Sequence, residues 1–155
     1  MKKQTIVLGG GIVGAVMAMD LAADEDREVT LYDADSKRLE SVVGHHKGLK
    51  GVQADLSDPA VVTKLACQAD LVLGALPGRL GLQTLEAVIE SGTPYCDISF
   101  MPEDGWHLSA KAEATGCVAV IDCGVAPGIS NLLAGVAAHR FSPCHRICIR
   151  VGGLP

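Results

Sequence analysis

Three glycines near the N-terminus have the spacing of a phosphate-binding turn. Gly9, Gly11 and Gly14 fit the pattern G-x-G-x-x-G, between the apolar run Ile6–Leu8 and a helix-like segment. In that setting the first glycine allows a tight turn, the second lets a pyrophosphate approach the backbone, and the third lets the helix pack closely on a sheet. The N-terminus of the helix would face the phosphates with its partial positive charge. The pattern therefore predicts a dinucleotide site.

An acidic residue follows at the distance that such a site requires. The run from Glu28 to Asp33 reads as a strand that ends in a carboxylate. Asp33 lies about 20 residues after Gly14, where dinucleotide sites bind the adenosine ribose. It would accept bonds from a free 2′-hydroxyl and repel a 2′-phosphate, so the sequence favours NAD over NADP. Lys37 and Arg38 follow closely, and we assign both to the surface of the next helix.

The elements that position these residues alternate along the chain. Strands are expected at Thr5–Leu8, Glu28–Tyr32, Leu49–Gln53, Leu71–Ala75, Pro94–Ile98 and Val118–Asp122. Helices are expected at Ile12–Ala22, Lys37–Val43, Pro59–Cys67, Leu82–Ser91, Glu103–Thr115 and Ile129–Ala138. Several strands are continuous apolar runs, which indicates a parallel sheet buried on both faces. We predict an α/β, doubly wound Rossmann fold with helices on both faces and strand order 3-2-1-4-5-6.

In such a sheet a ligand binds at the carboxyl ends of the strands, near the point where the strand order reverses. After the third strand, Asp55 could accept a bond from the adenine amino group beside Leu56, or it could simply cap the next turn. After the fourth strand, small and apolar residues could line the passage from pyrophosphate to nicotinamide. They are Ala75, Leu76 and Pro77.

Two more carboxylates stand at strand ends near the expected nicotinamide position. Asp97 could bind the cofactor amide, hold a substrate ammonium or exchange protons, and it is the one catalytic candidate. Asp122 is assigned to loop capping. Cys96 and Cys123 neighbour them, but no adjacent histidine would activate either thiol, so nucleophilic catalysis is not expected.

Composition and charge narrow the class of protein. The chain has 155 residues, enough for one domain with a full core. Its net charge of -5 argues against a nucleic-acid or anionic-membrane surface. The six cysteines match no common metal-site spacing and mostly fall in apolar runs, so we expect reduced thiols, no metal and a cytoplasmic protein. Lys2 and Lys3 before an apolar run would suit a signal peptide, but its cleavage would remove the first strand.

The C-terminal segment has a different pattern. In residues 145–151, Ile147, Ile149 and Val151 share one face of an expected strand. Such alternation is typical of antiparallel sheets with one solvated face. We therefore predict a dinucleotide-binding domain at residues 1–142, and at residues 143–155 the first strand or linker of a truncated α+β substrate and dimerisation domain.

The segment D-C-G-V-A-P-G-I-S-N, residues 122–131, is the most distinctive in the chain. With G-G-L-P at residues 152–155 and the strand end Tyr95–Ser99, it resembles the saccharopine dehydrogenase family, in particular its lysine 6-dehydrogenase-like branch. The resemblance covers the whole chain, but only as the cofactor domain of that family.

The resemblance implies an NAD(P)-dependent enzyme that acts on a carbon–nitrogen bond of a small amino-acid substrate, through an imine that is then hydrolysed. It implies a homodimer in the full-length protein and an inactive isolated domain, because most substrate contacts would lie elsewhere. It places at the cofactor Gly9, Gly11, Ile12, Val13, Gly14, Asp33, Asp55, Ala75, Leu76, Pro77 and Asp97. It places on the nicotinamide side Val125, Ala126, Pro127 and Gly128.

The alternative is a regulatory nucleotide-sensing Rossmann domain, like the RCK domains of potassium transporters. Such sensors share the glycine pattern, the acidic end of the second strand and an aspartate after the third. The G-V-A-P-G-I-S-N and G-G-L-P segments favour the dehydrogenase, because nothing in a sensor requires them.

Overall fold

The structure, a computed structural model, describes residues 1–44, 46 and 48–152. Its centre is one parallel sheet of six strands in the order β3-β2-β1-β4-β5-β6. The strands are β1 Lys3–Leu8, β2 Arg27–Asp33, β3 Leu49–Gln53, β4 Leu71–Gly74, β5 Tyr95–Asp97 and β6 Ala119–Val120. The predicted doubly wound Rossmann fold and its strand order are therefore confirmed.

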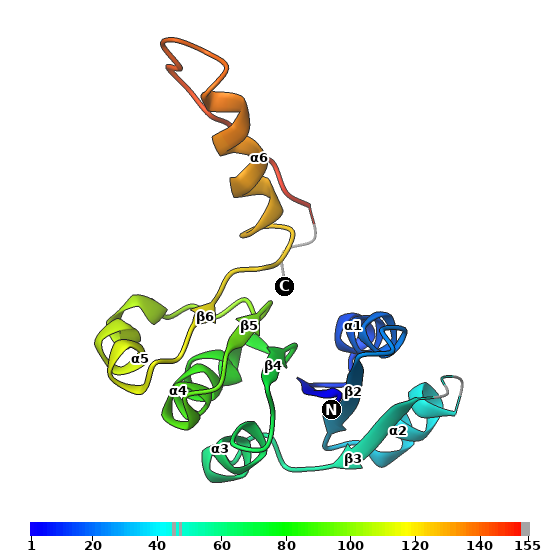
Figure 1. Ribbon diagram of the computed structural model, residues 1–155. Coiled ribbons are helices and arrows are strands. Elements are labelled where there is room, and N and C mark those ends of the chain that lie inside the picture. Colours follow the sequence, from blue (N-terminus) through cyan, green and yellow to red (C-terminus); the bar gives the residue numbers. More distant parts are fainter. Residues whose placement is uncertain (45, 47, 153–155) are drawn as a thin grey trace.

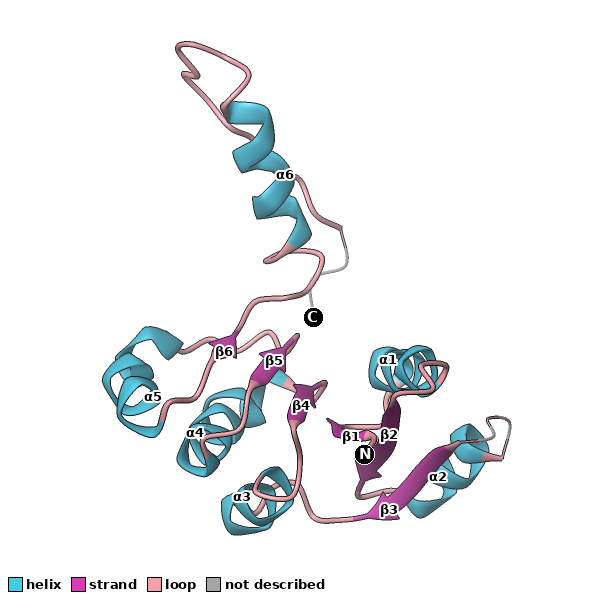
Figure 2. Ribbon diagram, in the orientation of Figure 1, coloured by secondary structure: helices cyan, strands magenta, loops and turns pink. Residues whose placement is uncertain are grey.

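Helices cover both faces of the sheet (Figure 2). On one face lie α1 (Ile12–Ala22) and α2 (Ser36–Val43), and on the other lie α3 (Pro59–Ala66), α4 (Gly81–Ser91) and α5 (Ser109–Thr115). Two apolar cores follow from this layering, because alternate strand residues point to opposite faces. Val7 packs in the core beneath α1 and α2, whereas Ile6 and Leu8 pack in the core beneath the other three helices.

Local side-chain chemistry sets the helix ends. The Asp35 carboxylate accepts from the backbone N–H groups of Lys37 and Arg38 and so caps α2. The Asp58 carboxylate accepts from a backbone N–H of α3, whose first residue is the expected proline. Gly92 ends α4 with a φ of 72°, a left-handed conformation that glycine adopts at little cost.

Two elements in the C-terminal half of the chain are shorter than predicted. The helix expected at residues 103–115 is a 3-10 turn at Gly105–Leu108 followed by α5, because the Asp104 carboxylate caps the turn at the Trp106 N–H. The strand β6 ends at Val120. Asp122 has a φ of 60°, which turns the chain out of the strand direction.

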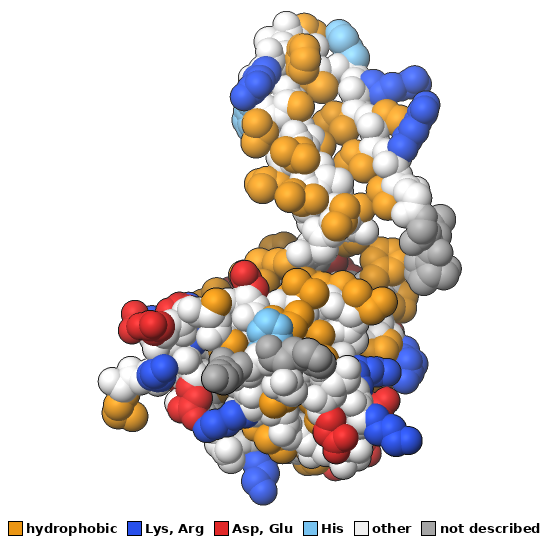
Figure 3. Space-filling model, turned by 90° about the vertical axis from the view of Figure 1, so that its right-hand side faces the viewer, with side chains coloured by type: hydrophobic (Ala, Val, Ile, Leu, Met, Phe, Trp, Pro, Cys, Tyr) orange, Lys and Arg blue, Asp and Glu red, His pale blue; other side chains and the backbone are white. Residues whose placement is uncertain are grey.

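The last helix, α6 (Ile129–Ala138), stands away from the sheet, and the chain then returns beside it (Figure 1). We call residues 129–152 the α6 arm. Apolar side chains gather along it (Figure 3), and no residue of α6 is buried.

Residues 145–151, predicted as a strand, form no strand in this structure. The alternating apolar residues Ile147 and Ile149 instead line a hollow against Leu133 and Ala137 of α6. A strand forms only with a hydrogen-bonding partner, and no described strand pairs with this segment. Of the G-G-L-P segment, residues 153–155 lie outside the described part of the chain. Among the helices of the described chain, none has the length and apolar character needed to cross a membrane.

Candidate functional site

A cleft of about 370 Å³ opens at the carboxyl ends of β1 and β4, where the strand order reverses. Its walls are the turn between β1 and α1, the end of β2, and the loops that follow β4 and β5. The lining residues are Gly9, Gly11, Ile12, Val13, Gly14, Asp33, Arg38, Ala75, Leu76, Pro77, Ile98, Ser99 and Phe100. The structure therefore brings together the predicted glycine turn, Asp33 and the three residues after β4.

The glycine turn is built from three different requirements. Gly9 has a φ of 102°, and a Cβ there would lie 2.6 Å from the Ala75 carbonyl oxygen. A Cβ at Gly14 would overlap the Gly9 carbonyl oxygen and lie 2.9 Å from the Ala75 Cβ. At Gly11, by contrast, a Cβ would meet no atom within 4 Å. Two glycines thus serve the fold, and Gly11 leaves open space at the N-terminus of α1, where a pyrophosphate fits.

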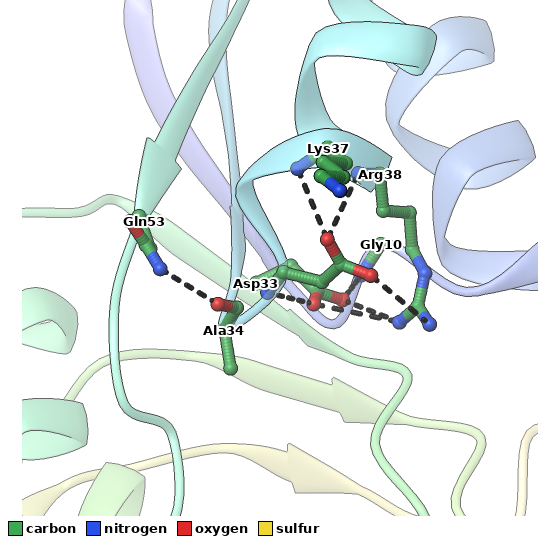
Figure 4. A network of polar contacts seen from close by, with 7 residues as sticks. Gly10, Asp33, Ala34, Lys37, Arg38 and Gln53 are labelled. Atoms are coloured by element: carbon green, nitrogen blue, oxygen red, sulfur yellow. Dashed lines mark hydrogen bonds and ion pairs between the residues drawn. The ribbon is translucent and has the colours of Figure 1, made fainter.

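Asp33 is the centre of a polar network in the wall of the cleft (Figure 4). Its carboxylate accepts from the Gly10 N–H at 2.6 Å and from the Asp35 N–H at 2.8 Å. The Arg38 guanidinium donates to the same carboxylate at 3.2 Å. Burial opposes ionisation of Asp33, but the two backbone hydrogen bonds and the Arg38 charge outweigh it and lower its pKa.

Arg38 changes the interpretation of this end of the cleft. The sequence assigned it to the helix surface, whereas the structure places its half-exposed side chain on Asp33 and in the lining of the cleft. The guanidinium neutralises the carboxylate that was expected to repel a 2′-phosphate. The physical reason for favouring NAD over NADP is therefore removed. Its position in the first turn of α2, shortly after the acidic strand end, is the signal that could have identified it.

Ile98, Ser99 and Phe100 also line the cleft and were not predicted to do so. They follow β5, the strand next to β4, so their backbone reaches the same edge of the sheet. The rule that selected the ends of strands applied to them, but it was used only for the charged residue Asp97.

Asp97 lies behind the cleft lining. It is 1% exposed and accepts hydrogen bonds from the Tyr95 hydroxyl at 3.0 Å and from the Ser99 hydroxyl. Burial raises its pKa, although these hydrogen bonds oppose the shift. Ser99 lines the cleft and Asp97 does not. In this arrangement Asp97 can reach a ligand only through Ser99, so its place is that of a residue that orients the serine.

The raised pKa of Asp97 predicts a pH-dependent effect on stability. A carboxyl with a higher pKa in the folded than in the unfolded state loses stability as pH rises from about 4. We therefore expect Asp97→Asn to gain stability relative to the wild type between pH 3.5 and pH 7, measured as the change in the urea unfolding midpoint. Loss of these hydrogen bonds also changes the size of the stability difference, so the readout is how that difference changes with pH.

Asp55→Asn is the control for this experiment. Hydrogen bonds from Ser57 lower the pKa of Asp55, so its contribution is present at neutral pH and lost as pH falls through its folded pKa. The Asp55→Asn variant should lose stability relative to the wild type as pH rises over the same range. A difference between wild type and Asp97→Asn that does not change with pH would contradict the assignment.

Two other predicted residues and one predicted segment lie outside the cleft lining. Asp55 is exposed and accepts from the Ser57 N–H at 3.0 Å, which is the turn-capping role left open by the sequence. Leu56 is 4% exposed and packs in the core beneath α3 and α4, so its place beside the adenine stays a prediction. The segment Val125, Ala126, Pro127 and Gly128 joins the sheet to α6, and Val125 is 75% exposed.

In the part of the chain that the structure describes, no three His, Cys, Asp or Glu side chains group as ligands of a metal ion would. The polar groups that the cleft presents include the N-terminus of α1 and the Asp33–Arg38 pair.

Comparison with known proteins shows the family to which residues 5–120 are similar. The model of one protein family, described as "Saccharopine dehydrogenase NADP binding domain", matches residues 5–120. A saccharopine dehydrogenase (NADP+, L-glutamate-forming) from Schizosaccharomyces pombe is 23% identical over 129 residues, 83% of this chain and 29% of the relative. A carboxyaminopropylagmatine dehydrogenase from Synechocystis is 25% identical over 161 residues, 94% of this chain and 40% of the relative.

A solved structure shows the same fold. Saccharopine dehydrogenase (L-Glu forming) from Saccharomyces cerevisiae superposes with a TM-score of 0.79 at 23% identity, over 89% of this chain and 31% of that one. The chain thus spans well under half the length of these relatives.

Proposed function

Because the chain belongs to the family of saccharopine dehydrogenase NADP-binding domains, we propose that it is the cofactor-binding part of an oxidoreductase acting on a carbon–nitrogen bond of an amino acid. The observation that carries this proposal is the cleft at the carboxyl ends of β1 and β4, with the glycine turn on one side and the Asp33–Arg38 pair at one end. Residues that contact the substrate belong mainly to parts of the relatives that this chain does not span.

The residues of the cleft fit a nicotinamide dinucleotide. The open space at Gly11 and the N-terminus of α1 suit the pyrophosphate. The half-exposed guanidinium of Arg38 suits the adenosine end, and the apolar Leu76 and Pro77 suit the path toward the nicotinamide. When bound, this cofactor supplies hydride exchange with the substrate. The protein's own residues bind it, orient it and keep water from its apolar side.

The proposal names NADP as the preferred form. Arg38 keeps half of its side chain exposed while it holds Asp33, so its exposed N–H groups can meet a 2′-phosphate. The family is described as NADP-binding, and the Schizosaccharomyces pombe relative is an NADP-dependent enzyme by name. Both facts support the choice of a phosphate-bearing ribose at this end.

Calorimetric titration of the 155-residue chain with NADP, NAD and ATP tests the proposal. We expect NADP to bind most tightly, and Arg38→Ala to weaken NADP binding about 10-fold or more while changing NAD binding little, because a charged hydrogen bond to phosphate is lost. Lys37→Ala is the matched control, since Lys37 reaches the network only through its backbone N–H. Preference for ATP over both dinucleotides would instead support a regulatory nucleotide sensor.

The substrate and the assembly would be tested in a protein of the relatives' full length. Saccharopine and lysine are the first compounds to assay with NADP or NADPH, lysine because of the lysine 6-dehydrogenase-like motif at residues 122–131. The proposal includes a homodimer, which sedimentation velocity would measure. Turnover with neither compound would contradict the substrate class, and it would leave the binding result of the cofactor domain standing.

A further inference from the structure

Two thiols that the proposed function does not use lie together at the end of the sheet. Cys96 is in β5, where its Cα pairs with that of Val120 in β6. Cys123 follows β6, and its N–H donates to the Asp97 carbonyl oxygen at 3.0 Å. The Cys123 sulfur lies 3.7 Å from the Val120 carbonyl oxygen, so it turns back to the level of Cys96. The two thiols are therefore neighbours, and the Cys123 thiol contributes to the raised pKa of Cys96.

The sharp turn at Asp122 makes this contact possible. Along a regular strand, neighbouring side chains point to opposite faces. Cys123 would then lie on the face opposite Val120 and its partner Cys96. The left-handed φ of 60° at Asp122 breaks that alternation. It lets the Cys123 sulfur approach its neighbour on β5.

The two thiols differ in reactivity. Cys123 is exposed, whereas Cys96 is half-buried. Burial raises the pKa of Cys96 to about 11, and the contact with Cys123 and the charge of Asp97 add to the shift. A thiolate is the nucleophile in disulfide exchange, and access controls its rate. Cys123 is therefore the thiol that reacts first, and Cys96 is the one that can resolve the product.

We propose that Cys96 and Cys123 form a reversible redox site that exchanges with low-molecular-weight disulfides such as oxidised glutathione. The Cys123 thiolate attacks one sulfur of the reagent, so that a mixed disulfide forms and one small thiol leaves. Cys96 then attacks the Cys123 sulfur, which closes the protein disulfide and releases the second small thiol. The two cysteines lose two electrons and two protons in total, and the two released thiols take up both.

The position of the disulfide gives it a structural consequence. Cys123 begins the segment that joins the sheet to the α6 arm, and its neighbour Gly124 is bridged to Gly128 at the start of α6. A bond to Cys96 would tie this connection to β5. It would also close a loop that contains the whole of α5, which restricts the unfolded chain and raises the urea midpoint of the oxidised form.

The test is peptide mapping of the folded chain after equilibration with oxidised glutathione. Free thiols are blocked with N-ethylmaleimide, the protein is digested, and the peptides are identified by mass spectrometry. We expect the wild type to give a cross-linked pair of peptides that contain Cys96 and Cys123. In Cys96→Ser, Cys123 should instead carry glutathione, because the resolving thiol is gone. Cys67→Ser, which removes an exposed thiol near the start of β1, should leave the cross-link unchanged.

A second variant guards against a folding defect at the half-buried position. In Cys123→Ala the remaining Cys96 should resist glutathione, because the exposed attacking thiol is absent. Three results would overturn the proposal. They are wild-type Cys123 carrying as much glutathione as in Cys96→Ser, a disulfide from Cys123 to another cysteine, and full alkylation of Cys123 after equilibration.

Discussion

Gly14→Ala is expected to lower the free energy of unfolding by about 3 kcal/mol, as overpacking against rigid atoms does. The new Cβ would overlap the carbonyl oxygen of Gly9 and lie 2.9 Å from the Cβ of Ala75. The Gly9 oxygen belongs to a turn in which Gly9 has a φ of 102°, a conformation that residues other than glycine rarely adopt. Because the obstacle is backbone, no side-chain rotation relieves it. Chemical denaturation followed by circular dichroism measures the change.

Whether Gly14→Ala lowers or raises the free energy of unfolding shows which of two effects is larger. Alanine in a helix interior is normally better than glycine by about 1 kcal/mol, so a loss means that the overlap exceeds the gain in helix propensity. Gly135→Ala is the matched control, because Gly135 lies inside α6 and a Cβ there would meet no atom within 4 Å. It should leave stability unchanged or slightly raised. Equal losses in both variants would show that helix packing on the sheet is not what Gly14 serves.

The sheet could be predicted from the sequence because its signals are local. Apolar runs, the proline that opens α3 and the glycine after α4 each mark an element without reference to distant residues. The three spaced glycines likewise predict the turn and the start of its helix from one short segment. Once the strand order is given, the carboxyl ends of β1 and β4 must meet, and that places the cleft.

The sequence did not predict features that depend on contacts between particular residues of different elements. Arg38 lies on Asp33 because α2 begins directly after the strand and turns its first residues back over the strand end. Leu56 follows an acidic residue at a strand end, yet it is drawn into the core beneath α3 and α4. Alternation at residues 145–151 indicates two faces of different polarity, but it does not supply a partner strand.

The glycine turn also separates folding from binding, and Gly11 is the position that shows it. Gly11 has a φ of −64° and a ψ of −176°, a conformation open to any residue, and a Cβ there would meet no atom of the protein within 4 Å. The same space is where the pyrophosphate must approach the backbone. A methyl group at Gly11 would therefore clash only when a dinucleotide is bound.

We therefore expect Gly11→Ala to weaken dinucleotide binding about 100-fold or more, while the loss of unfolding free energy stays below about 1 kcal/mol, the scale of a changed helix cap. Calorimetric titration with NADP and urea denaturation on the same preparation measure both quantities. Gly135→Ala should bind NADP as the wild type does, because α6 lies outside the cleft lining. If Gly11→Ala bound NADP normally, the phosphates would have to lie away from the N-terminus of α1, and the proposed cofactor position would be wrong.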